Sequence, residues 1–151
     1  MNEFVKIVEV GPRDGLQNEK QALTVEQRLN FINDLISAGL KSIEVGSCVS
    51  AKWVPQMAQS DELFKLLPQT TDVQFSLLTP NIKGFETAQA VGCKEVAVFT
   101  AASESFTRKN INCSIDESFE KFSDVMNAAK AHNIRVRGYV SCIVDCPYEG
   151  A

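Results

Sequence analysis

The feature that most constrains this chain is a regular alternation of apolar, β-prone segments with amphipathic helical segments. Strands are predicted at five ranges: 5–10, 41–45, 73–78, 95–100 and 134–143. Helical spacing of apolar residues predicts helices at four ranges: 25–36, 57–67, 82–91 and 115–129. Strands that alternate with helices in this way are typical of a parallel sheet with helices packed outside it. The sequence therefore predicts the α/β class.

Capping residues mark the ends of two predicted helices. Thr24 followed by Gln27, and Ser114 followed by Glu117, are capping boxes, in which side chains satisfy free backbone N–H groups of the first helical turn. Gly39 stands where the first of these helices needs a glycine to end it. The apolar residues after the two caps share one helical face: Val25, Leu29, Ile32, Leu35 and Ile36 in the first, and Ile115, Phe119, Phe122, Met126 and Ala129 in the second.

Two architectures fit this alternation, an open flavodoxin-like sheet and part of a (β/α)8 barrel. No G-x-G-x-x-G motif or P-loop follows any predicted strand, which weakens the nucleotide-binding open sheet. Residues 101–113 form a polar stretch that we predict to be a loop, and a loop of that length indicates a function.

Composition and charge exclude several classes of protein. The 151 residues carry a net charge of −4 without a basic stripe, which argues against a nucleic-acid partner. No apolar run approaches the roughly 20 residues that a membrane helix needs. The first predicted strand begins directly after residues 1–4, which leaves no room for a targeting segment, so a cytoplasmic location is expected. The five scattered cysteines are expected to be reduced thiols.

Charged residues stand at the carboxyl ends of the first two predicted strands. Arg13 and Asp14 follow the first, and Glu44 and Ser47 close the second. A guanidinium beside a carboxylate can bind an anionic substrate and a hard cation, although a local ion pair that caps a turn fits equally well. Later strands end in further polar residues: Thr79, Asn81, Thr100, Ser103, Glu104, Ser141 and Cys142. Because these ends share one rim of a parallel fold, they favour a site there.

Five runs of residues, in order along nearly the whole chain, carry a resemblance to a known family. They are Gly-Pro-Arg-Asp-Gly-Leu-Gln-Asn-Glu at 11–19, Ser-Ala-Lys-Trp-Val-Pro-Gln-Met at 50–57, Leu-Thr-Pro-Asn-Ile-Lys-Gly-Phe at 78–85, Ala-Ser-Glu at 102–104 with Lys-Asn-Ile-Asn-Cys-Ser at 109–114, and Arg-Gly-Tyr-Val-Ser-Cys at 137–142 with Cys-Pro-Tyr-Glu-Gly at 146–150. In them the chain resembles the 3-hydroxy-3-methylglutaryl-CoA lyase family. The resemblance implies a TIM (β/α)8 barrel.

The resemblance also implies a reaction. The family cleaves the acyl-CoA substrate (S)-3-hydroxy-3-methylglutaryl-CoA to acetyl-CoA and acetoacetate, a retro-Claisen cleavage assisted by Mg²⁺ or Mn²⁺. A base removes the proton of the tertiary hydroxyl, the carbon–carbon bond breaks, and an acetyl-CoA enolate is left. The metal binds the hydroxyl and a carboxylate oxygen, which favours the alkoxide. Leucine breakdown and ketone-body formation are the pathways that the family suggests.

The resemblance implies roles for seven residues. Asp14 matches the metal-ligand aspartate, Arg13 the arginine that contacts the substrate and stabilises the enolate, and Glu44 an acidic residue that orients Arg13 or the metal site. Substrate contacts are implied, besides Arg13, at four positions: Gln17, Ser47, Asn110 and Tyr139.

Other parts of the family's site do not occur in this sequence. The family completes its metal site with a His-x-His pair and an asparagine, and uses a cysteine on a glycine-rich loop; none of these matches residues 1–151. The resemblance therefore implies that residues 1–151 are the N-terminal part of one TIM-barrel catalytic domain, with about the first five strands present. This part is expected to be inactive alone, and the full-length enzyme is expected to be able to form a homodimer.

Two alternatives to the lyase stay open. The wider superfamily that shares the Arg-Asp-Gly turn includes Claisen-type acyltransferases and aldolases. A truncated product without catalytic activity, which only binds a partner, is the other alternative.

Overall fold

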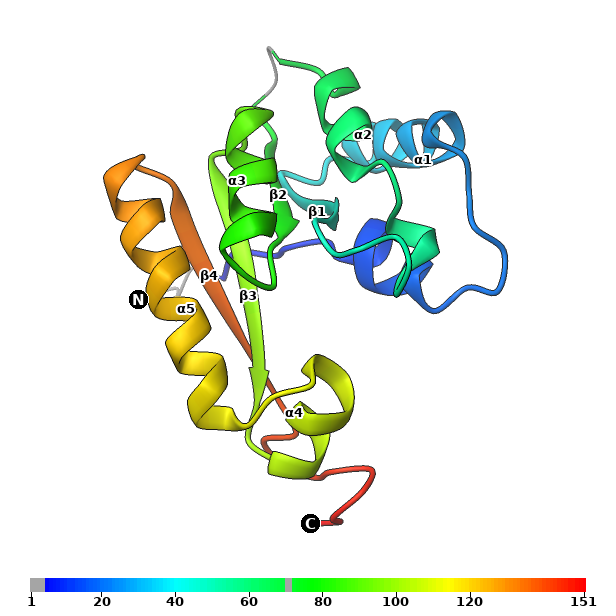
Figure 1. Ribbon diagram of the computed structural model, residues 1–151. Helices are drawn as coiled ribbons and strands as arrows, with labels where there is room; N and C mark the ends of the chain where they lie inside the picture. The colour runs from blue at the N-terminus through cyan, green and yellow to red at the C-terminus, as the bar shows by residue number, and fades with distance from the viewer. Residues whose placement is uncertain (1–4, 70–71) are drawn as a thin grey trace.

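The computed structural model describes residues 5–69 and 72–151 and shows one parallel sheet with helices (Figure 1). The strands lie in the order β1 (Ser42–Ser47), β2 (Gln74–Leu78), β3 (Glu95–Ala101) and β4 (Arg135–Ser141). The helices are α1 (Val25–Ser37), α2 (Ser60–Leu66), α3 (Ile82–Ala90), α4 (Glu104–Ile111) and α5 (Ile115–Ala131), with a π-helical turn at Gly11–Gly15 and a 3-10 turn at Pro55–Met57. None of these helices is long and apolar enough to cross a membrane. The predicted α/β class is confirmed.

The strand predicted at 5–10 is wrong. Glu9 pairs with Ile43 through an isolated parallel bridge, and residues 5–8 have no strand structure. Val5 and Ile7 are 76 % and 72 % exposed, so no element of the described chain covers them. An apolar segment forms a strand only where ladder partners and a packed face are available. Residues 1–4, on which the expectation about a targeting segment rested, lie outside the described residues.

The loop predicted at 101–113 is also wrong, because this stretch contains α4. The Ser103 hydroxyl accepts a hydrogen bond of 3.1 Å from the backbone N–H of Phe106, which caps the first turn. The helix ends at Ile111 and is followed by its C-cap Asn112, whose φ of 51° lies in the left-handed region. The stretch is polar because much of α4 faces solvent, and polarity alone does not distinguish a loop from an exposed, capped helix.

Both predicted capping boxes are confirmed. In α1, the Gln27 backbone N–H donates to Thr24 Oγ1 at 3.2 Å, and the Thr24 N–H donates back to Gln27 Oε1 at 2.9 Å. In α5, Ser114 and Glu117 make the same reciprocal pair at 3.0 and 2.7 Å. Gly39 follows the C-cap of α1 with a φ of +95°, which a residue with a side chain adopts at a cost.

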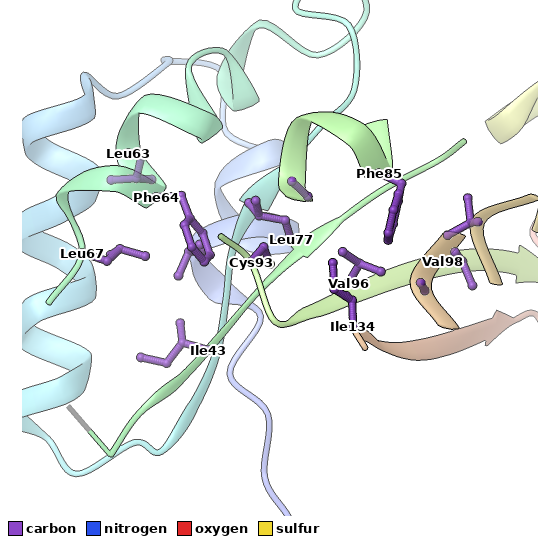
Figure 2. Close-up of a cluster of buried hydrophobic side chains, with 14 of the residues drawn as sticks. Ile43, Leu63, Phe64, Leu67, Leu77, Phe85, Cys93, Val96, Val98 and Ile134 are labelled. Carbon is purple, nitrogen blue, oxygen red and sulfur yellow. The ribbon is translucent and has the colours of Figure 1, made fainter. Parts of the chain in front are cut away.

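One hydrophobic cluster joins four helices to one face of the sheet. Figure 2 shows its centre, where Ile43, Leu77 and Val96 of adjacent strands meet Phe64 of α2 and Phe85 of α3. Helices α1, α2, α3 and α5 all contribute buried side chains to this cluster. Because side chains alternate along a strand, the residues between these apolar positions point to the opposite face. That face carries several polar side chains, among them Glu44, Ser76 and Arg137, and these belong to the candidate site.

The apolar stripe predicted for α5 is only partly buried. Phe122 and Ala129 belong to the hydrophobic cluster, whereas Phe119 and Met126 are 56 % and 51 % exposed. The helix packs against α3, β3 and β4 through one side, and nothing in the described residues covers its other apolar side chains.

Candidate functional site

Arg13 and Asp14 lie in the π-helical turn that follows the bridge at Glu9. Their backbone N–H groups donate to the Val10 carbonyl at 3.0 and 2.7 Å, and Pro12 occupies a first-turn position, where a missing N–H costs nothing. Arg13 Nη1 donates to Asp14 Oδ1 at 2.7 Å, so the local ion pair exists. Arg13 is buried, whereas the Asp14 side chain is 57 % exposed. The turn therefore fixes the guanidinium and leaves the carboxylate accessible.

Glu44 in β1 is fully buried, and its carboxylate binds side chains from two other elements, the π-helical turn and β4. Arg13 Nε donates to Oε1 at 2.6 Å, while Arg137 Nη2 and the Tyr139 hydroxyl donate to Oε2 at 2.7 and 2.8 Å. Burial of a carboxylate is costly unless it is paired and hydrogen-bonded, and here both oxygens are engaged. Arg13 thus has two carboxylate partners, the exposed Asp14 beside it in the turn and the buried Glu44 of β1.

The strands bring this network together because its members lie on one face. Arg137 and Tyr139 are two residues apart on β4 and therefore point the same way. Arg137 also donates to Glu95 Oε1 on β3 at 2.8 Å and to Ser76 Oγ on β2 at 3.2 Å. Ser76 is the register partner of Glu44. The guanidinium of Arg137 therefore connects all four strands.

The network also sets the protonation of two of its members. Burial and the Glu44 carboxylate raise the pKa of Tyr139 to about 12. Burial alone would lower the pKa of Arg137, but its hydrogen bond to Glu44 and the nearby acidic groups raise it overall. At neutral pH Tyr139 is therefore a protonated donor and Arg137 a cation. The Tyr139 ring also lies 5.7 Å from Arg13 Cζ, within the range of a cation–π contact.

Three members of this network were not among the predicted site residues: Arg137, which holds Glu44 directly, and its partners Glu95 and Ser76. Arg137 is the first residue of the run 137–142 that resembles the family, but the resemblance implies no role for it. The available signal was the alternation of Arg135, Arg137 and Tyr139 in one strand, which places three polar groups on one face. Glu44 and Glu95 on two other strands are the acidic residues that can form ion pairs with these arginines.

Five of the seven predicted site residues line one open cavity of about 1290 Å³: Arg13, Asp14, Gln17, Ser47 and Asn110. Residues 47–51 and the N-terminal end of α2 form another part of the wall. The other two predicted residues, Glu44 and Tyr139, lie behind Arg13 and contact it. The structure thus divides the predicted set into residues that face the cavity and residues that hold Arg13.

Helix α4 carries Asn110 to this cavity, and the last residues of the chain hold the helix. The Ser105 backbone N–H in its first turn donates to Glu149 Oε1 at 3.1 Å. Lys109 Nζ lies 3.6 Å from the centre of the Tyr148 ring, a cation–π contact. The Phe106 ring of the same helix lies 6.2 Å from the Phe99 ring of β3, so the wall that bears Asn110 contacts both the sheet and the C-terminal residues.

The described residues do not complete a metal site. Within 5–69 and 72–151 no group of three histidine, cysteine, aspartate or glutamate residues could hold a metal ion. Asp14 is the predicted ligand that lines the cavity, and its Oδ2 accepts no hydrogen bond from the described residues. Glu44 cannot easily serve, because three donors occupy its carboxylate.

Comparison with known proteins gives a consistent family assignment. The family described as HMGL-like matches residues 4–150. Hydroxymethylglutaryl-CoA lyase of Pseudomonas mevalonii is 59 % identical over 149 residues, which is 99 % of this chain and 50 % of that protein. The chain therefore spans about half the length of the curated relatives it matches. Relatives from Homo sapiens are named both cytoplasmic and mitochondrial, so the cytoplasmic location stays a prediction.

Solved structures agree with the fold. The crystal structure of hydroxymethylglutaryl-CoA lyase from Pseudomonas aeruginosa has a TM-score of 0.92 at 57 % identity, covering 97 % of this chain and 49 % of that one. The structure of an HMG-CoA lyase from Acenitobacter baumannii, in complex with coenzyme A and 3-methylmalate, has a TM-score of 0.91 at 30 % identity and covers 99 % and 50 %. The four strands and their helices thus match the N-terminal part of a TIM barrel, which confirms the barrel prediction.

Proposed function

The chain belongs to the HMGL-like family, and from this premise we propose that a full-length protein carrying it is a hydroxymethylglutaryl-CoA lyase. The reaction is retro-Claisen cleavage of (S)-3-hydroxy-3-methylglutaryl-CoA to acetyl-CoA and acetoacetate. Relatives that are 56–59 % identical to this chain are named for this activity. The acyl-CoA substrate class also agrees with the coenzyme A in the complex of the Acenitobacter relative.

The observation that carries the proposal is the placement of Arg13. Arg13 lines the cavity, and Glu44 and Asp14 hold its guanidinium at 2.6 and 2.7 Å. Cleavage moves negative charge onto the thioester oxygen only as the carbon–carbon bond breaks. A cation that is fixed beforehand stabilises this charge without reorganisation, which is how an enzyme binds the transition state more tightly than the substrate. Arg13 is the residue to which we assign this role.

The remaining cavity residues act on binding and orientation. Gln17, Ser47 and Asn110 present polar atoms to an acyl-CoA substrate from three separate elements. Glu44 orients Arg13, and Tyr139 in turn donates to Glu44.

Enzymes of this family are metal-dependent, and Asp14 is the residue of this chain that we propose as a ligand of Mg²⁺ or Mn²⁺. An exposed carboxylate oxygen is the type of ligand that a hard divalent cation prefers. One carboxylate does not make a site, so the other ligands must come from a part of the full-length protein outside the described residues. We derive no step of the reaction through the metal.

A direct assay tests the proposal. The full-length protein, incubated with (S)-3-hydroxy-3-methylglutaryl-CoA and Mg²⁺ or Mn²⁺, should release equal amounts of acetoacetate and acetyl-CoA. Incubation with 2-oxo acids and acetyl-CoA separates the alternative, because a Claisen-type acyltransferase of the same superfamily would consume acetyl-CoA there. Consumption in the second assay without cleavage in the first would overturn the assignment.

The isolated 151-residue chain provides a second test. We expect no turnover from it, because it carries one of the metal ligands and only part of the cavity wall. Clear turnover by this chain alone would show that the assignment of the missing ligands is wrong.

A further inference from the structure

Arg28 on α1 is a buried cation that pairs with no carboxylate in the described part of the chain. Its side chain is 1 % exposed, and burial lowers its pKa. Its Nη donors go to neutral acceptors: Nη1 to the Ala58 carbonyl at 2.8 Å, and Nη2 to Ser60 Oγ at 3.1 Å and the Val45 carbonyl at 3.4 Å. The buried Nε has no hydrogen-bond partner among the described residues. A buried charge without an ionic partner is costly, so its presence calls for a reason in the structure.

The acceptors of Arg28 bracket one wall of the candidate cavity. Val45 precedes residues 48–59, a segment with little regular structure, and Ala58 and Ser60 stand at its far end. Gln59, between these two acceptors, has a φ of 57°, a left-handed conformation that is uncommon for a residue other than glycine. Arg28 therefore binds the chain on both sides of the segment. Two of its acceptors, Ala58 and Ser60, flank Gln59, the residue with the unfavourable backbone conformation.

Ser60 links Arg28 to a predicted substrate contact. Its hydroxyl accepts from Arg28 Nη2 and, at 3.2 Å, from the backbone N–H of Ser47, and it donates to the Met57 carbonyl at 2.7 Å. A serine hydroxyl offers one donor and two acceptor positions, so Ser60 is fully used. The backbone of Ser47, which lines the cavity, is therefore bound to the same hydroxyl that Arg28 holds.

Gly46 lies directly against the Ser60 hydroxyl and the Arg28 guanidinium, which leaves no room for a side chain. A Cβ atom at Gly46 would lie 2.5 Å from Ser60 Oγ and 2.9 Å from Arg28 Nη2. Contacts this short do not occur, so any side chain at this position would displace the hydroxyl or the guanidinium. Glycine is therefore needed here for close approach rather than for an unusual φ angle.

We propose that Arg28 is a positioning residue of the candidate site, which fixes Ser47 and the 48–59 wall of the cavity by holding Val45, Ala58 and Ser60 together. The inference rests on the proposed function only for its kinetic readout. It predicts that Arg28 governs the order of this wall while the sheet and the Arg13–Glu44 network stay intact. Lysine cannot replace it fully, since one ammonium group does not reproduce the fork of the guanidinium.

Hydrogen exchange of the full-length protein, followed by mass spectrometry, tests the structural part. In Arg28→Met, amides of residues 46–60 should exchange at least about tenfold faster, while amides of β3 and β4 keep their rates, because the change is local. In Arg28→Lys, the exchange rates of residues 46–60 should lie between those of the unchanged protein and those of Arg28→Met. Ile32→Val is the matched control, since Ile32 is a fully buried residue of the same helix that contacts the hydrophobic cluster. It should not accelerate 46–60 selectively.

Kinetics tests the functional part. In Arg28→Met, KM for the acyl-CoA should rise by about fivefold to tenfold with a smaller change in kcat, and Arg28→Lys should restore part of it. Equal acceleration of exchange in all segments, or the same pattern in Ile32→Val, would overturn the proposal by showing a general loss of stability. If exchange of residues 46–60 is selectively faster but the full-length protein has no lyase activity, the positioning role of Arg28 stands and the proposed function is wrong.

Discussion

Arg13 Nε lies 2.6 Å from Glu44 Oε1, although 31 residues separate the two in the sequence. The pair joins the π-helical turn to the first strand of the sheet, and Arg137 and Tyr139 engage the other oxygen of the same carboxylate. Two arginines that would repel each other are therefore held around one buried anion. This arrangement makes the position of Arg13 depend on residues throughout the sheet.

Replacement of Glu44 by glutamine should impair both stability and activity. The neutral amide removes the charge between Arg13 and Arg137, and loss of one partner of a buried pair costs about 3–5 kcal/mol in the free energy of unfolding. We also expect kcat of the full-length enzyme to fall about 10²-fold, because Arg13 loses its orientation. Urea unfolding and steady-state assays measure the two effects. Glu86→Gln, an exposed change on α3, should alter neither.

Replacement of Arg13 by glutamine should abolish cleavage and leave the fold intact, because Arg137 and Tyr139 still pair with the Glu44 carboxylate. The variant lacks the cation to which we assign stabilisation of the developing enolate, and removal of such a group costs at least about 10²–10³ in kcat. Arg13→Lys should recover little, because one ammonium cannot contact Glu44 and Asp14 as the guanidinium does. Circular dichroism checks the fold. Near-normal turnover in Arg13→Gln would contradict the assigned role.

Alkaline titration should reveal the environment of Tyr139. An unfolded tyrosine has a pKa of about 10, whereas burial and Glu44 raise the pKa of Tyr139 to about 12. Because the folded state holds this proton more tightly, its contribution to stability is complete below pH 10 and is lost as the pH rises towards 12. Absorbance at 295 nm should show a component with this midpoint that Tyr139→Phe removes. An unchanged titration curve in the variant would contradict the assignment.

Two cysteine thiols should resist alkylation in the folded protein. All five cysteines are free, and burial raises the pKa of Cys48 to about 12 and that of Cys93 to about 11. The thiolate is the reactive form, so at pH 8 neither should react appreciably with iodoacetamide until urea unfolds the chain. Peptide mapping identifies the labelled residues. Rapid labelling of Cys48 in the native state would show that its surroundings are less apolar than the structure indicates.

Features that depend on neighbours in the sequence were predictable. The capping boxes at Thr24 and Ser114 need only residues three positions apart, and the ion pair of Arg13 with Asp14 needs only adjacent residues. The order of the four strands of the sheet and of α1, α2, α3 and α5 also follows from the periodicity of apolar residues, because burial of one face imposes that period. These features hold in the structure as the sequence predicts them.

Tertiary structure decided the remainder. Residues 5–10 have the composition of a strand, but most of them lack a ladder partner. Residues 104–111 form a helix within a stretch that has the composition of a loop, and contacts with Phe99 of β3 and with Glu149 hold this helix. Arg137 meets Glu44 across 93 residues, a distance in sequence at which no local pattern indicates contact. The amino-acid sequence by itself determined which residues are chemically able to act. Sheet register and the close approach of α1 to β1 decided which of them meet, since such contacts depend on the whole packed fold.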